Sequence, residues 1–156
     1  MKWFVWAVIL VVAVSIIAGF FVVGSPKTER MRRFDDRRVS DLQNVQSQIV
    51  NFWQSRERLP ESLDNLTDDV SGWFAPRDPE TDLPYEYAVS DSEALTFSLC
   101  ADFSLEGSAE SNGYYSITPF GYLSGAWDHP SGYYCFDRTI DPELYPPLEK
   151  ALRPKL

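Results

Sequence analysis

The sequence has 156 residues and a formal net charge of −9 at pH 7, with 23 acidic residues against 14 basic ones. This length allows one modest domain beside an apolar segment, and a hydrophobic content of 44% is sufficient to give that domain a core. The acidic excess argues against nucleic acid as a partner, because phosphate binding needs a cationic face.

The first predicted element is an apolar helix. Residues 3–23 form a run of 21 residues without a charge, and a helix of that length spans about 30 Å, the thickness of the bilayer hydrocarbon. A cleaved signal peptide is the alternative, but its apolar part would be shorter, and Val22-Val23-Gly24-Ser25 is a poor cleavage site. We therefore predict a transmembrane anchor at residues 1–26, with the lipid bilayer as the partner of residues 3–23.

An amphipathic helix is predicted over residues 27–58, where apolar side chains recur at three- and four-residue spacing and neither Gly nor Pro intervenes. Its distal half is expected to pack on a sheet and to bury Ile49 and Trp53. Its first part, residues 27–38, holds six basic residues against three acidic ones. This stub either contacts anionic lipid headgroups or forms a solvated face of Arg–Asp pairs, and we favour the solvated face.

Residues 59–140 are predicted to form a small α+β domain. Pro60 suits the first turn of a short helix that runs to about Leu66. After an irregular, Pro-rich loop around residues 75–79, alternating patterns predict antiparallel strands. The predicted strands are residues 85–89, 95–100 and 132–136, with a turn at 90–93 and a further short strand at 114–117. Residues 141–156, with four prolines, are expected to form a poorly ordered tail.

The order of these segments is distinctive over residues 1–100. A membrane helix precedes an amphipathic helix carrying Asp41-Leu42-Gln43, then Leu59-Pro60-Glu61-Ser62-Leu63, then the run DPETDLPYEY at residues 78–87. This order resembles type IV pilins and the major pseudopilin of type II secretion. The chain departs from that family in lacking the prepilin cleavage motif and the glutamate within the anchor. The resemblance implies a long helix packed on a small antiparallel sheet, and a structural rather than catalytic role.

Two cysteines, Cys100 and Cys135, lie in predicted strands 35 residues apart. We predict a disulfide between them, which is expected in an exported domain. The alternative is a pair of buried free thiols in a cytoplasmic domain.

The side of the membrane on which the domain lies is predicted from two opposing signals. Basic residues are more numerous after the anchor than before it, which by the positive-inside rule favours a cytoplasmic domain. The resemblance to pilins favours the extracytoplasmic side. We choose the extracytoplasmic side and keep the cytoplasm as the alternative.

No catalytic constellation is recognisable in the sequence, so we predict a non-catalytic protein without cofactor or metal. The single histidine, His129, lies in Trp127-Asp128-His129-Pro130 and is expected on the surface or in a turn. Alternating Asp78, Glu80 and Asp82 imitate a calcium loop but lack its glycine and its bidentate glutamate.

Two functions follow as hypotheses. The first is a membrane-anchored interaction protein whose aromatic loops meet a protein partner or another copy; the candidate contact residues are Tyr114, Tyr115, Tyr122, Trp127 and Tyr133. The second is a membrane-tethered ligand-binding domain or enzyme that uses the 106–130 loop, with His129 as its titrating group. A concave polar pocket at His129 would favour the second.

Overall fold

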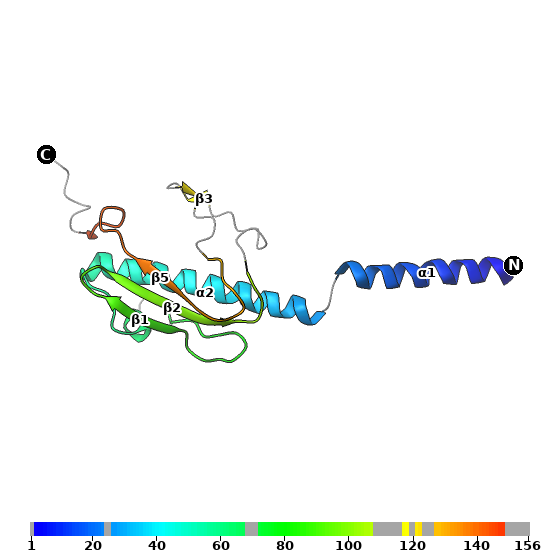
Figure 1. The fold of residues 1–156 in the computed structure, drawn as a ribbon, viewed down its shortest axis with the longest axis horizontal. Helices are drawn as coiled ribbons and strands as arrows, with labels where there is room; N and C mark the ends of the chain where they lie inside the picture. Colours follow the sequence, from blue (N-terminus) through cyan, green and yellow to red (C-terminus); the bar gives the residue numbers. More distant parts are fainter. Residues whose placement is uncertain are drawn as a thin grey trace. The chain divides into compact units, whose positions relative to one another are not determined.

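The computed structural model describes residues 2–23, 26–67, 72–107, 117–118, 121–122 and 127–148. The helices are α1 (Lys2–Val23), α2 (Pro26–Arg56) and the 3-10 helix η1 (Leu63–Leu66). The strands are β1 (Glu86–Asp91), β2 (Thr96–Phe103), β3 (Ile117–Thr118), β4 (Gly121–Tyr122) and β5 (Gly132–Thr139) (Figure 1). The chain divides into two compact units, Met1–Arg33 and Phe34–Leu156.

The first unit contains α1 and the beginning of α2. The described side chains of α1 are all exposed, and the large apolar ones lie all around the helix from Trp3 to Ile17. Among the residues that the structure describes, no helix is both long enough and apolar enough to cross a membrane. The predicted transmembrane anchor therefore stays a prediction.

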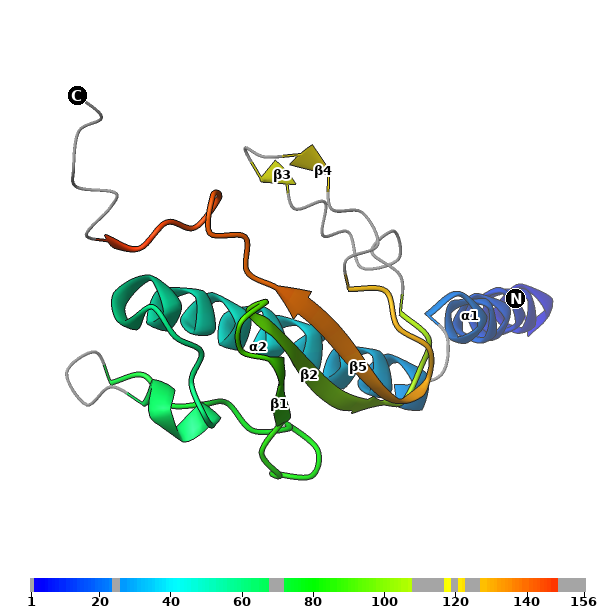
Figure 2. The ribbon, with the colours of Figure 1, turned by 60° about the vertical axis from the view of Figure 1, so that its left-hand side comes forward.

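The second unit is an α+β domain, as predicted. Its three-stranded sheet has the order β1-β2-β5, and both strand pairs are antiparallel (Figure 2). Glu86 pairs with Cys100, which in turn pairs with Cys135. The two-residue strands β3 and β4 pair with each other.

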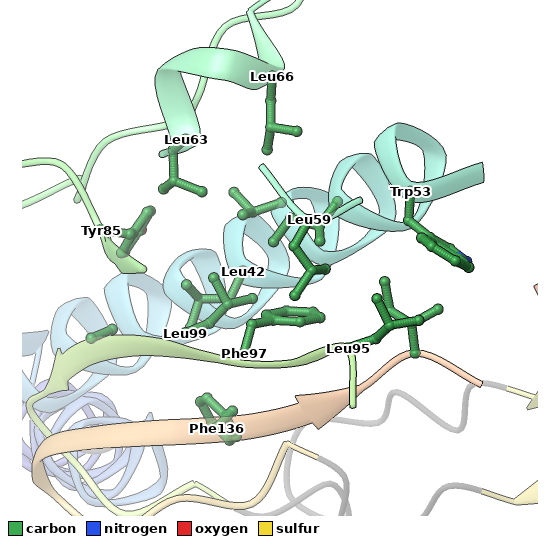
Figure 3. Packing of buried hydrophobic residues seen from close by; sticks show 14 of the residues in the cluster. Leu42, Trp53, Leu59, Leu63, Leu66, Tyr85, Leu95, Phe97, Leu99 and Phe136 are labelled. Atoms are coloured by element: carbon green, nitrogen blue, oxygen red, sulfur yellow. The ribbon is translucent and has the colours of Figure 1, made fainter. Parts of the chain in front are cut away.

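The core lies between α2 and one face of the sheet (Figure 3). Leu42, Val45 and Ile49 of α2 are fully buried, and they face a row of buried residues on β2, because alternate residues of a strand point to the same face. That row consists of Phe97, Leu99, Ala101 and Phe103. The predicted burial of Ile49 and Trp53 is confirmed.

The short helix begins later than predicted. Only residues 63–66 are helical, and they form a 3-10 turn rather than a helix starting at Pro60. The side chain of Asn65 accepts a hydrogen bond from the backbone N–H of Ser62 and so closes the start of this turn. Pro60 lies outside the helix, and its carbonyl accepts a hydrogen bond from the Tyr87 hydroxyl at 2.9 Å.

The hairpin strands are longer than predicted, and the turn between β1 and β2 lies at residues 92–95 rather than 90–93. The reason is the carboxylate of Asp91, which accepts hydrogen bonds from the backbone N–H groups of Glu93 and Ala94. Leu95 closes the turn with a φ of 56°. The predicted strand at 114–117 falls largely outside the described residues, which include only Ile117 of it.

The beginning of the C-terminal segment contacts α2, which the sequence did not lead us to expect. The indole N–H of Trp53 donates to the carbonyl of Tyr145 at 3.1 Å, and the amide of Gln54 donates to that of Pro146 at 3.2 Å. Residues 141–148 of the predicted poorly ordered tail are therefore tied to the end of the long helix, whereas residues 149–156 of it lie outside the described residues.

Candidate functional site

A buried group of charges surrounds Arg38. Its side chain is only 3% exposed although it belongs to the predicted solvated stub. The guanidinium donates to Asp35 at 2.7 Å, to Glu80 at 2.9 Å and, through two nitrogens, to both carboxylate oxygens of Asp78. The prediction of a solvated Arg–Asp face is therefore wrong at this position.

The sequence carries a signal for this burial. Arg38 precedes Leu42 by four residues and Val45 by seven, so it lies on the buried stripe of the helix. An arginine can be buried at such a position only if carboxylates pair with its charge. One of those carboxylates, Asp35, lies one turn earlier in α2; the others come from a loop more than thirty residues away, which local spacing does not reveal.

Asp78 shapes the loop that supplies two of these carboxylates. Its side-chain oxygen accepts hydrogen bonds from the backbone N–H groups of Glu80 and Thr81, both at 2.9 Å. A bridge between Arg77 and Pro84 closes the loop at its base. The alternating acidic residues that resemble a calcium loop therefore have another role here, because Asp78 and Glu80 accept hydrogen bonds from Arg38. Among the described residues, no three His, Cys, Asp or Glu side chains are arranged to hold a metal ion.

Asp35 connects the same cluster to the end of β2. Its two carboxylate oxygens accept hydrogen bonds from the backbone N–H groups of Ser104 and Leu105, at 3.0 and 2.9 Å. The cluster therefore joins three segments of the chain, namely α2, the loop at residues 77–84 and the residues that follow β2. The hydrogen bonds of this cluster fix the position of α2 on the sheet.

Two groups of this cluster, Arg38 and Asp78, have shifted pKa values. Burial by itself lowers the pKa of Arg38, but its hydrogen bonds with Asp78, Glu80 and Asp35 outweigh this and hold the pKa above its ordinary value. Burial raises the pKa of Asp78, yet the hydrogen bonds from Arg38 and from the backbone prevail and lower it to about 2. Both groups are therefore charged at neutral pH.

A second buried pair lies one helical turn further along α2. The Tyr85 hydroxyl donates to Asp41 at 3.1 Å, and exposed Arg37 contacts the other oxygen of Asp41 at 3.1 Å. Burial raises the pKa of Asp41, and the attraction of Arg37 offsets part of that rise. Burial also raises the pKa of Tyr85, as does its carboxylate neighbour.

The predicted disulfide is present. Cys100 of β2 and Cys135 of β5 stand directly opposite each other in the antiparallel register and are bonded. Their neighbours in the strands, Leu99 and Phe136, belong to the core cluster, so the cysteines lie on the sheet face turned away from α2.

His129 is buried, so the expectation of a surface or turn histidine is wrong. Its ring stacks on Phe103 with a centroid separation of 3.6 Å, and its backbone forms two hydrogen bonds of 3.0 Å with Gly107. A Cβ placed on Gly107 would collide with the imidazole. The ring thus fills a packed site rather than a concave polar pocket, and it gives no support to the hypothesis of a titrating group in a ligand-binding loop.

The predicted aromatic contact residues fall into three groups. Tyr114, Tyr115 and the side chain of Tyr122 lie outside the described residues. Trp127 is half-buried against the core, with the Arg138 guanidinium 4.5 Å from its ring centre. Tyr133 is exposed, and its hydroxyl donates to Glu86 at 2.7 Å across the outer face of the sheet.

Sequence reasoning also missed apolar side chains exposed on the domain. Phe74 and Leu83 have exposed fractions of 66% and 63%, and Leu144 and Leu148 of the C-terminal segment have 59% and 52%. Phe74 lines a shallow groove of about 400 Å³ beside Leu63 and Tyr87. A contiguous patch of such side chains would mark a surface that contacts another protein, whereas apolar side chains exposed singly are normal.

The comparisons with known proteins give no relative. No protein-family model matches the chain, and neither the curated proteins nor the solved structures gave a match. The pilin-like assignment remains an interpretation of the sequence.

Proposed function

We propose that this chain is a membrane-anchored, non-catalytic, pilin-like structural or interaction protein that presents an acidic α+β domain at the membrane surface. The observation that carries the proposal is the packing of the long helix α2, from residue 34 onward, on a small antiparallel sheet. This is the arrangement that the resemblance to pilins implies. The buried cluster around Arg38 supports a structural role, because its charged groups are used to join segments of the domain.

The membrane anchor is supported by the sequence. The uncharged run extends to Val23 and so continues past Ile17, the last residue of α1 whose side chain the structure describes. Apolar side chains surround the described part of the helix and are exposed. An apolar surface on every side of a helix is unfavourable in water and favourable in lipid.

We place the domain on the extracytoplasmic side. The Cys100–Cys135 disulfide supports this choice, because structural disulfides persist in oxidising compartments and are rare in the cytosol. The count of basic residues around the anchor supports the cytoplasm instead. We give the disulfide more weight than the count of basic residues, because both cysteines of the chain are bonded in it and such bonds are rare in the cytosol.

Membrane anchoring is tested by fractionation. The full chain and a fragment beginning at Lys27 are expressed in a bacterial host, and their membranes are washed at high pH. We expect the full chain to stay in the membrane pellet and the fragment to be soluble and folded. A full chain that is released as a soluble monomer would count against the anchor.

The interaction role is tested by photo-crosslinking in cells. A photoreactive amino acid is placed at exposed Leu83 or Leu144, and at exposed, polar Ser92 as the matched control. We expect adducts of higher mass from the two apolar positions and none from the control. Equal yields at all three positions, or none at any, would oppose a specific protein contact at these side chains.

A further inference from the structure

A groove runs along β2 where that strand loses its partner on one side. Strand β1 begins at Glu86, which pairs with Cys100, so among the described strands residues 101–103 of β2 pair only with β5. The groove has a volume of about 430 Å³ and lies between this stretch and the loop at residues 77–84. Leu83 of that loop lines it and is 63% exposed. The end of β2 is therefore an accessible strand edge.

The backbone of Asp102 points into this groove. Cys100 and Cys135 have a Cα separation of 4.0 Å, the short separation of an antiparallel pair whose backbones are not hydrogen-bonded to each other. The backbone groups of Cys100, and of Asp102 two residues later, therefore point towards the β1 side. The β1–β2 register would place Pro84 opposite Asp102, and a proline has no N–H to donate. No described residue forms a backbone hydrogen bond with Asp102 on that side.

The side chains beside this edge favour a cation. The charged residues described in the lining of the groove are four acids and one base, namely Asp78, Glu80, Glu86, Asp102 and Arg38. Arg38 binds two of these acids, whereas the exposed carboxylate of Asp102 forms no ion pair with a described residue. Tyr133, directly opposite Asp102 on β5, is 60% exposed, and its hydroxyl donates to Glu86 at 2.7 Å. An aromatic ring beside such a carboxylate is a favourable site for a guanidinium.

We infer that this groove binds an extended, arginine-bearing segment of a partner protein. The segment adds to the open edge of β2 through hydrogen bonds with the backbone of Asp102. Its residue opposite Asp102 points to the same sheet face as that carboxylate, because directly opposite residues share a face. An arginine at this position pairs with Asp102 and stacks on Tyr133. The inference deepens the proposed interaction role, on which it rests, and does not depend on the membrane anchor.

The test is a titration of the full chain in non-ionic detergent, monitored by the NMR signals of its backbone amides. The probe is the peptide Val-Thr-Arg-Thr-Val, and its counterparts carry glutamate in place of arginine or a methyl group on the backbone nitrogen of the arginine. The site variant is Asp102→Asn/Tyr133→Leu. The control variant Glu93→Gln/Tyr145→Leu removes a carboxylate and a tyrosine ring at exposed positions outside the groove.

We expect the arginine peptide to shift the amide signals of the groove, with that of Asp102 among them. An exposed ion pair and a cation on an exposed ring each strengthen binding about two- to fivefold, so the site variant should bind about tenfold more weakly. The control variant should bind within about twofold of the natural chain. The methylated peptide should bind about fivefold more weakly, because it lacks a backbone donor.

Equal binding of the arginine and glutamate peptides, or equal weakening in the two variants, would overturn the inference. Photo-crosslinked adducts at Leu83 without binding of the arginine peptide would also overturn it, and would leave the interaction role standing. A natural chain that dimerises where the site variant stays monomeric would assign the groove to a second copy instead.

Discussion

Removal of Arg38 is expected to destabilise the domain strongly. The substitution Arg38→Ala leaves Asp35 and Asp78 without their cation, while their side chains are only 6% and 11% exposed. Glu80 is 48% exposed and can turn to water. Removing one partner from a buried ion pair costs about 3–5 kcal/mol, because the remaining charges stay desolvated. We expect a loss of that size in the free energy of unfolding.

The assay is urea unfolding of the fragment that begins at Lys27, with tryptophan fluorescence as the signal that monitors unfolding. The matched control is Arg33→Ala, which removes an arginine from the same helix whose ion pair is exposed and is expected to cost about 0.5 kcal/mol or less. Equal losses in the two variants would refute the argument that Arg38 fixes the helix on the sheet.

Three further predictions follow from the packing. Ile49→Ala should lower the free energy of unfolding by about 2–5 kcal/mol because Ile49 is fully buried, whereas exposed Arg32→Ala should change it little; urea unfolding compares them. Because the pKa of Asp78 is lowered to about 2, its contribution is complete above about pH 4 and is lost as the pH falls towards 2. The natural domain should therefore lose about 2 kcal/mol more than Asp78→Asn over that range, and equal pH profiles would contradict this. Gly107→Ala should cost about 1–3 kcal/mol, measured by thermal melting, because its Cβ would collide with the His129 ring. An unchanged melting temperature would contradict the tight packing of that ring.

The regular elements of the domain were predictable because their signals are local. Three- and four-residue spacing identified α2 and the burial of Ile49 and Trp53, and alternation identified the centres of β1, β2 and β5. The ends of the strands were harder. The turn after β1 depends on the side chain of Asp91, which caps the backbone after the strand rather than within it.

The candidate site was predicted only in part, because its contacts are long-range. The Cys100–Cys135 pairing follows from two adjacent strands and was foreseen. Arg38 and Asp78 are brought together from distant parts of the chain, and the local sequence around either residue does not indicate its partner. His129 was expected on the surface since its neighbours are polar and turn-forming, whereas Phe103, on another strand, buries its ring.

One mass measurement tests the proposal that the domain is anchored in the membrane and lies on its extracytoplasmic side. Cells that express the full chain are quenched with acid, free thiols are alkylated, and the intact chain is recovered from alkali-washed membranes. We predict a membrane-bound chain without alkyl groups and about two mass units lighter than its reduced form, with Cys100 and Cys135 bonded. A chain that carries two alkyl groups would contradict the extracytoplasmic placement, and a chain that is found only in the wash would contradict the membrane anchor.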